Sequence, residues 1–166
     1  MTISIPTAFW DKYYEACDFF LDDTHIGREC TIVYPPKRTA CVNCTNPVGS
    51  TTTNVYRHGG PAPFSFGSCP LCGDNGYKEE ESTDTLQLRV YWSRADWLRI
   101  AGSIVADDAD VMIIGYMTDV TKVRRASNII LASDNNESQY RATVTGKPTP
   151  WGFGRNRYFI AFLKGA

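Results

Sequence analysis

The sequence predicts a mainly β protein: a small antiparallel β-barrel or sandwich with a short N-terminal helix and a cysteine-rich insertion. Three observations support this fold class. Short apolar segments, some alternating with period two, are spaced along the chain between turn residues. An amphipathic segment of helical period lies near the start of the chain. Four of the six cysteines form two Cys-x-x-Cys pairs inside a segment that is poor in aliphatic residues.

The composition is that of an ordinary globular protein, with 166 residues, of which 43% are hydrophobic and 21% are charged. This length suits one compact domain, in which 1–36 holds the helix and first strand, 37–84 the insertion and 85–166 the remaining strands. The formal net charge of -1 offers no bulk attraction to nucleic acid or to an anionic membrane. Because we find neither a signal peptide nor a long apolar stretch, we expect a cytosol-like compartment and no membrane partner.

The N-terminal helix is predicted from Pro6 to Leu21. Its apolar residues recur at intervals of three and four, which places them on one side of a helix. Core packing explains this aromatic face better than a partner-binding surface does. The residues concerned are Phe9, Trp10, Tyr13, Tyr14, Cys17, Phe20 and Leu21.

The strands follow from apolar patterning. Residues 30–34 are β-branched and are stopped by two prolines, and residues 86–92 alternate with period two, which indicates one buried face. A turn or short helix is expected at 94–98. Residues 111–117 form an apolar run of strand length that we expect to be buried on both faces. Further strands are predicted at 128–133, 140–145 and 157–163, separated by turn residues at 146–150 and 151–154.

The insertion has an unusual source of order. It is dense in small and polar residues, so it cannot build a large apolar core. Cys41 and Cys44 are separated by 24 residues from Cys69 and Cys72. Two residues between paired cysteines allow a tight turn to aim both sulfurs at one point, and two such turns supply a tetrahedral shell. The sequence therefore predicts a structural Zn2+ in a zinc-ribbon-like insertion, with a hairpin between the pairs formed by 55–57 and 64–66.

Other uses of these cysteines fit less well. Disulfides are disfavoured because the chain is large and lacks a secretory signal, and redox pairs are disfavoured because no βαβ context surrounds them. Catalytic zinc needs an open coordination position, which four thiolates would fill. His58 can replace one cysteine, but a lone histidine beside two glycines is more often a loop residue. Cys17 and Cys30 are interpreted as small buried apolar residues.

The remaining polar clusters carry weaker signals. Asp107, Asp108 and Asp110 resemble part of a calcium loop but lack its glycine and distal glutamate, so a solvated turn is the better interpretation. No catalytic residue is predicted, and we expect neither enzymatic activity nor a small-molecule substrate. Basic and aromatic residues form candidate interface or nucleic-acid contacts, although most such clusters are solvated faces. The candidates are Trp10, Trp97, Lys122, Arg124, Arg125, Trp151, Phe153, Arg155 and Arg157.

Several segments, taken in order, resemble a family of small neck proteins of tailed bacteriophages, the head-completion or stopper type of head–tail connector. They are Gly27–Pro35 leading into the two cysteine pairs, Gly115–Val120 and Arg157–Phe162. The resemblance implies a small β-barrel that assembles as a homo-oligomeric ring between the portal or adaptor and the tail. Such a ring closes the DNA channel and docks the tail.

On this resemblance the protein is a structural virion protein, assembled in the host cytoplasm, whose partners are portal, adaptor and tail proteins. Contact with packaged DNA is left open. Stopper domains usually lack a zinc insertion, which here would form a rigid loop that contacts neighbouring subunits. The alternative is a zinc-ribbon module that binds nucleic acid, with Arg57 and Lys78 framed by the cysteine turns.

Overall fold

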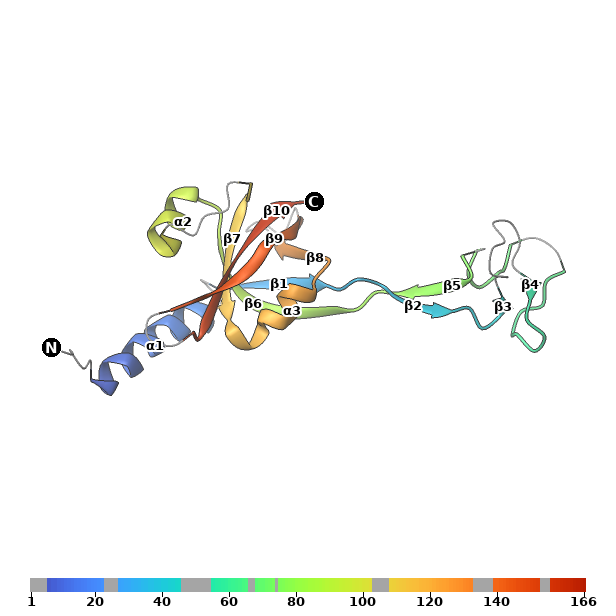
Figure 1. Cartoon of the computed structure of the whole chain (residues 1–166), viewed down its shortest axis with the longest axis horizontal. Helices are drawn as coiled ribbons and strands as arrows, with labels where there is room; N and C mark the ends of the chain where they lie inside the picture. The colour runs from blue at the N-terminus through green and yellow to red at the C-terminus, as the bar shows by residue number, and fades with distance from the viewer. Residues whose placement is uncertain are drawn as a thin grey trace. The chain divides into compact units, whose positions relative to one another are not determined.

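The structure is a computed structural model of the whole chain (Figure 1). It divides into two compact units, Met1–Tyr34 with Thr83–Ala166, and Pro35–Ser82. The described residues are 6–22, 27–45, 55–65, 68–73, 75–102, 108–132, 139–152 and 156–166. In chain order the elements are α1 (Thr7–Asp22), β1 (Arg28–Val33), β2 (Lys37–Ala40), β3 (Cys44–Thr45), β4 (Val55–Tyr56), β5 (Tyr77–Glu80), β6 (Thr83–Tyr91), α2 (Arg94–Ala101), β7 (Val111–Tyr116), η1 (Met117–Asp119), α3 (Val120–Arg125), β8 (Asn128–Ala132), β9 (Gln139–Trp151) and β10 (Tyr158–Gly165).

The first unit contains a closed barrel with the strand order β1-β6-β7-β10-β9-β8. All neighbouring strands are antiparallel, and the pairing of β8 with β1 closes the sheet. Cys30 illustrates this closure, because it lies opposite Leu86 of β6 and also opposite Leu131 of β8. The predicted mainly β fold, with a small antiparallel barrel and one N-terminal helix, is therefore confirmed.

Alternating side chains of the barrel strands fill two apolar clusters, one on each face of the sheet. In β7, Val111 and Ile113 belong to the cluster that fills the barrel, whereas Met112 and Ile114 belong to the cluster on its outer face. β10 divides its side chains in the same way, and its residues from Tyr158 to Leu163 are all buried. The prediction of a strand at 111–117 that is buried on both faces is confirmed for β7.

Helices α1 and α2 bury their apolar faces in the outer cluster. Tyr14 and Leu21 come from α1, and Trp97 comes from α2. A polar contact also ties α1 to the barrel, because the Tyr158 hydroxyl donates a hydrogen bond to the Asp18 carboxylate over 2.7 Å. Core packing therefore explains part of the aromatic face predicted for α1.

The second unit is built from two small antiparallel sheets, β2 with β5 and β3 with β4. In the first sheet, Arg38 pairs with Glu79 at 2.9 Å and places its guanidinium 4.6 Å from the centre of the Tyr77 ring. Two-stranded sheets of this kind are marginally stable on their own in water. Within the described part of this unit, the fully buried apolar residues are three cysteines, against which Phe64 packs.

The hairpin predicted between the cysteine pairs is wrong. Val55 and Tyr56 pair with Thr45 and Cys44, the residues that directly follow the first cysteine turn. Phe64 lies outside any strand and packs on the cysteine cluster, because this cluster is the apolar surface available to it. Phe66 lies outside the described residues.

The predicted turn at 146–150 is also wrong, because β9 continues through it to Trp151. Only the first residues of β9, up to Ala142, pair with β8, and the later residues pair with β10 alone. A strand with one unpaired edge tolerates proline, so Pro148 and Pro150 can be accommodated in this part of β9. Helix α3 was not predicted, although the short helix expected at 94–98 is present as α2.

Candidate metal centre

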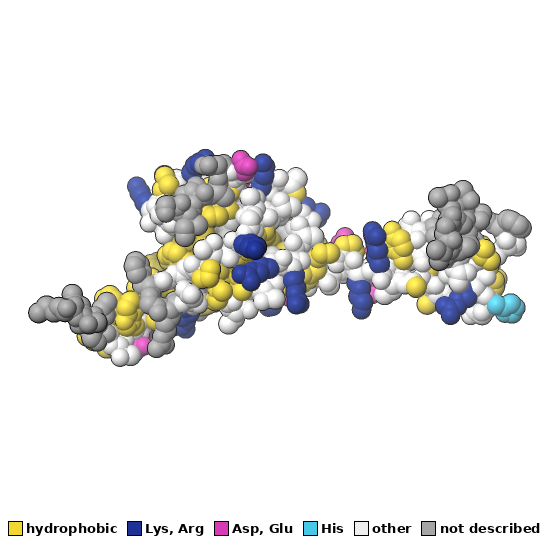
Figure 2. Space-filling model, in the orientation of Figure 1, with side chains coloured by type: hydrophobic (Ala, Val, Ile, Leu, Met, Phe, Trp, Pro, Cys, Tyr) yellow, Lys and Arg dark blue, Asp and Glu magenta, His cyan; other side chains and the backbone are white. Residues whose placement is uncertain are grey.

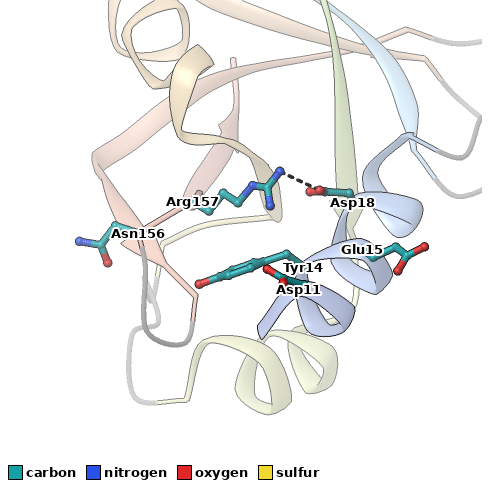
Figure 3. A pocket seen from close by; sticks show the side chains of 6 residues that line it. All are labelled: Asp11, Tyr14, Glu15, Asp18, Asn156 and Arg157. Atoms are coloured by element: carbon teal, nitrogen blue, oxygen red, sulfur yellow. Dashed lines mark ion pairs between the residues drawn. The ribbon is translucent and has the colours of Figure 1, made fainter. Parts of the chain in front are cut away.

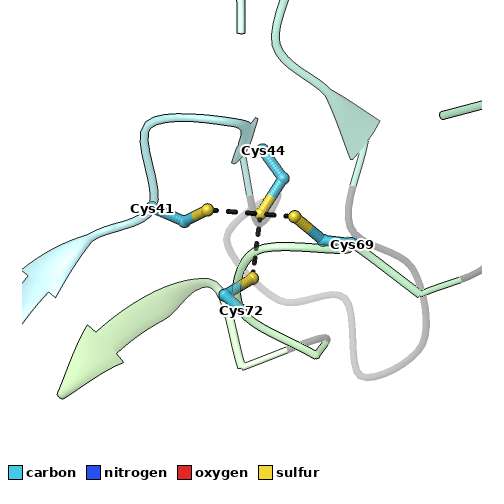
Figure 4. A group of neighbouring side chains, drawn as sticks. All are labelled: Cys41, Cys44, Cys69 and Cys72. Carbon is cyan, nitrogen blue, oxygen red and sulfur yellow. Dashed lines mark hydrogen bonds between the residues drawn. The ribbon is translucent and has the colours of Figure 1, made fainter. Parts of the chain in front are cut away.

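The two cysteine pairs converge on one point in the second unit (Figure 4). The Sγ atoms of Cys41, Cys44, Cys69 and Cys72 all lie within 4.8 Å of one another. Cys41 Sγ is 3.9 Å from Cys69 Sγ, and Cys44 Sγ is 3.4 Å from Cys72 Sγ. Three of the four residues are buried and Cys72 is partly buried. All four predicted ligands are therefore placed together and can bind a metal ion.

The distances fit a tetrahedral tetrathiolate site. A Zn–S bond of about 2.3 Å places two tetrahedral ligands about 3.8 Å apart, within the range of the sulfur separations found here. A disulfide would require about 2.05 Å between two sulfurs, whereas none of the six cysteines is disulfide-bonded. The arrangement therefore fits a metal ion better than disulfides.

Local backbone geometry explains the turn of the second pair and its connection to the first. The Gly73 amide donates to the Cys69 carbonyl over 2.9 Å, and the Cys41 amide donates to the Gly76 carbonyl over 2.9 Å. Gly73 and Gly76 have positive φ angles of 54° and 72°, which other residues adopt at a cost. Gly73 and Gly76, which follow the second pair, therefore permit the turn that returns the chain to β5.

The four thiols differ in their electrostatic surroundings. Burial raises the pKa of Cys44 and of Cys72 above the ordinary value of 9.0. Burial also acts to raise the pKa of Cys69, but hydrogen bonds from the Asn43 side chain and from two backbone amides stabilise its thiolate and lower that pKa to about 6. Cys69 is therefore the ligand best prepared to bind a cation at neutral pH.

Asn43, inside the first cysteine pair, is a site residue that the sequence analysis missed. It is fully buried, and its Nδ2 lies 3.5 Å from Cys69 Sγ. Its backbone amide also points at Cys41 Sγ, 3.4 Å away. The only sequence signal was its place between two cysteines, which does not reveal a long-range partner. By contrast, His58 is exposed and is not part of the cysteine group.

Two of the candidate interface residues have internal roles in the first unit. Arg157 forms an ion pair with Asp18 at 2.9 Å and lines an open surface cavity of about 620 Å³ (Figure 3). Trp151 is partly buried and donates its indole N–H to the Ile100 carbonyl over 3.1 Å. Trp97 is only 1% exposed, so the prediction that it contacts a partner is wrong.

The other candidates have mixed outcomes. Arg124 and Arg125 are exposed at the end of α3, and Arg124 lines a surface groove of about 550 Å³ with Lys147. Lys and Arg side chains gather on the face of the barrel seen in Figure 2. Phe153 and Arg155 lie outside the described residues. The structure therefore does not bring the predicted basic and aromatic residues together in one site.

The acidic turn contributes to the fold. Asp110 Oδ2 accepts hydrogen bonds from the Gly165 amide at 2.9 Å and from the Tyr140 hydroxyl at 3.1 Å. These hydrogen bonds lower the pKa of Asp110 below its ordinary value. Asp107 lies outside the described residues. Among the described residues, the four cysteines are the one cluster of three or more metal-ligating side chains.

Comparisons of the chain with protein-family models, curated proteins and solved structures found no match. Among the helices that the structure describes, none has the length and apolar character needed to span a membrane.

Proposed function

We propose that this chain is a structural protein that acts through contacts with other proteins, and that the second unit binds one structural Zn2+. The observation that carries the proposal is the exposure of large apolar side chains on helix α1 and in the two cysteine turns. In α1, Phe9 and Phe19 are 55% and 60% exposed, and hydrophobic side chains are visible on the surface of this helix in Figure 2. Aromatic residues exposed in this way are typical of protein interfaces.

The cysteine turns support the same role. Val42 and Leu71 lie inside the two pairs and are 64% and 48% exposed. A bound metal would hold these turns rigid, so both side chains could be presented to a partner with little loss of conformational entropy. A closed shell of four thiolates leaves no coordination position for water, which favours a structural metal over a catalytic one. Zinc is the metal that such a shell most often holds.

The barrel also favours a structural role. Its interior is filled by apolar side chains from all six strands. Among the described residues, no buried side-chain nitrogen or oxygen lacks a hydrogen-bond partner. A small closed barrel is the architecture implied by the resemblance to phage neck proteins, whereas the cysteine-rich unit departs from it.

We therefore propose, more specifically, a neck subunit of a tailed phage. In this role the barrel would form a homo-oligomeric ring between the portal or adaptor and the tail. The exposed aromatics of α1 and the metal-held turns would contact neighbouring subunits or tail proteins, and the ring would close the DNA channel. The virion is the corresponding location. Contact of the exposed Arg124 and Arg125, at the end of α3, with packaged DNA is compatible with this position.

The alternative, a nucleic-acid-binding zinc ribbon, receives less support from charge. Within Pro35–Ser82, four basic residues are balanced by four acidic residues, and a Zn2+ with four thiolates adds a formal charge of -2. A negative unit is repelled by phosphates, whereas nucleic-acid binding depends on neutralising them. The basic residues are Lys37, Arg38, Arg57 and Lys78, and the acidic residues are Asp74, Glu79, Glu80 and Glu81.

The proposal is tested by measuring the mass of the purified full-length chain by mass photometry, alone and with portal–adaptor complexes. Rings, or binding to a neck complex, are expected. Replacing Phe9 and Phe19 by serine should weaken this association, whereas Lys12→Ser, which changes another exposed residue of the same helix, should not. A chain that stays monomeric and binds no neck component would contradict the proposal. Binding to DNA that falls steeply with salt would favour the alternative.

A further inference from the structure

Asn43 is the one buried polar residue among the described residues, and its hydrogen bonds join two parts of the second unit. Its Nδ2 donates to the Ala62 carbonyl over 2.7 Å, and its Oδ1 accepts from the Ala62 amide over 2.8 Å. The same Nδ2 lies 3.5 Å from Cys69 Sγ. One side chain therefore contacts both a metal ligand and a loop that lies 19 residues further along the chain.

The backbone of Asn43 strengthens this link. Its carbonyl accepts a hydrogen bond from the Arg57 amide over 3.0 Å, and its amide lies 3.4 Å from Cys41 Sγ. Asn43 thus contacts a sulfur from each cysteine pair and both ends of the segment 57–62. This segment contributes no fully buried apolar residue. Its order must therefore come largely from hydrogen bonds of this kind.

The chemistry of the site requires an amide at position 43. The Ala62 amide needs an acceptor, while the Ala62 carbonyl and the Cys69 thiolate both need a donor. An asparagine side chain meets all three demands in one orientation. An aspartate would place a negative oxygen against both the carbonyl and the thiolate, and an alanine would leave the partly buried amide and carbonyl of Ala62 without these partners.

The packing around Asn43 is equally demanding. A Cβ atom on Gly60 would lie 2.6 Å from Asn43 Oδ1 and 2.9 Å from Asn43 Cα. These separations are too short for real atoms, so any larger residue at position 60 would displace Asn43. Gly60 therefore offers a second way to disturb the same contacts without changing the chemistry of residue 43.

We propose that Asn43 is the positioning residue of the metal centre. It orients the Cys69 thiolate toward the metal and couples metal binding to the ordering of the segment 57–62. The inference rests on the proposed binding of a metal by the four cysteines. Groups that hold metal ligands from outside the coordination shell typically change metal affinity by about 10–100-fold when they are removed.

The test uses the full-length chain and the variants Asn43→Asp, Asn43→Ala and Gly60→Ala. Asn75→Ala serves as the matched control, because Asn75 is an exposed asparagine near the second cysteine pair. Zinc affinity is measured by competition with a chromophoric chelator. We expect each of the three variants to bind zinc about 10–100-fold more weakly than the unchanged chain, and the control to bind it equally well.

Two further readouts separate positioning from general stability. Loss of a hydrogen bond to the Cys69 thiolate should shift the thiolate-to-metal charge-transfer band of the Co2+-loaded Asn43 variants to lower energy. With saturating zinc, hydrogen exchange at the Arg57 and Ala62 amides should become faster in these variants and stay slow in the control. These amides are chosen because both donate directly to Asn43.

The possible outcomes distinguish three failures. If the unchanged chain binds no metal, the proposed metal site is wrong and the inference fails with it. If the unchanged chain binds zinc but the Asn43 and Gly60 variants keep its affinity and its cobalt spectrum, the positioning role alone is wrong. If affinity falls while exchange at Arg57 and Ala62 is unchanged, the coupling to the segment 57–62 is wrong.

Discussion

Removing the metal should unfold the second unit and leave the barrel folded. Binding of structural zinc by four ligands supplies an apparent free energy of about 10–16 kcal/mol at neutral pH. This is comparable to the total stability of a typical domain, about 5–15 kcal/mol. In the described part of Pro35–Ser82, the buried apolar residues are Cys41, Cys44 and Cys69, so little hydrophobic burial would remain without the metal.

The barrel has an independent source of stability. Its inner cluster contains fourteen buried residues and includes none from the second unit. Burying one Ile, Leu or Phe side chain contributes about 1.5–3 kcal/mol, and several of these residues are fully buried. We therefore expect the thermal unfolding temperature of the barrel to change little when a chelator removes the metal.

Hydrogen exchange measured by mass spectrometry tests this prediction segment by segment. With EDTA at pH 7, amides such as those of Cys41, which donates to Gly76, and of Arg57 should lose their protection. Amides of β7 and β10 should keep theirs. Unchanged protection in the second unit would show that the metal is not its source of order. Simultaneous loss in both units would refute their independence.

Three further predictions concern the ligands and the barrel. The pKa values of Cys44 and Cys72 are raised above 9.0, so both thiols must lose a proton when zinc binds below that pH. Zinc affinity should therefore fall at least about 100-fold for each unit decrease in pH between 8 and 6. A chelator titration that shows pH-independent affinity would contradict this. Phe159→Ala should lower the free energy of unfolding of the barrel by about 3–5 kcal/mol in urea titrations, because Phe159 is fully buried. Zinc affinity should stay unchanged, and a loss of zinc affinity in this variant would contradict the independence of the two units. Tyr158→Phe removes a partly buried hydrogen bond to Asp18 and should lower the free energy of unfolding by about 1.5–3 kcal/mol, and by less if Asp18 is already asparagine. Equal costs in both backgrounds would rule out the interaction.

The sequence was informative where the signal is local. A Cys-x-x-Cys turn needs only its own residues and the following glycine, so the convergence of four thiols could be predicted from spacing. The strands β6 and β7 were predictable because period-two alternation and a continuous apolar run each reflect how many faces of a strand are buried. Helix α1 was predicted at 6–21 and is found at Thr7–Asp22, within the usual uncertainty of helix ends.

The sequence was uninformative where the structure depends on partners far along the chain. The sheet of β2 and β5 joins residues about forty apart, and its strands are mostly charged, so no apolar pattern marks them. The length of β9 depends on its having a single neighbour beyond Ala142, which a sequence does not reveal. Asn43 acquires its role from Ala62 and Cys69, and neither partner is adjacent to it in the sequence.

The central claim is that four thiolates bind one zinc ion, which orders a unit that has almost no apolar core. Elemental analysis of the full-length chain, purified without chelators and combined with native mass spectrometry, tests it most directly. One zinc ion per chain is expected, and Cys44→Ser with Cys72→Ser should abolish it. Purified, folded protein that contains no stoichiometric metal would contradict the account.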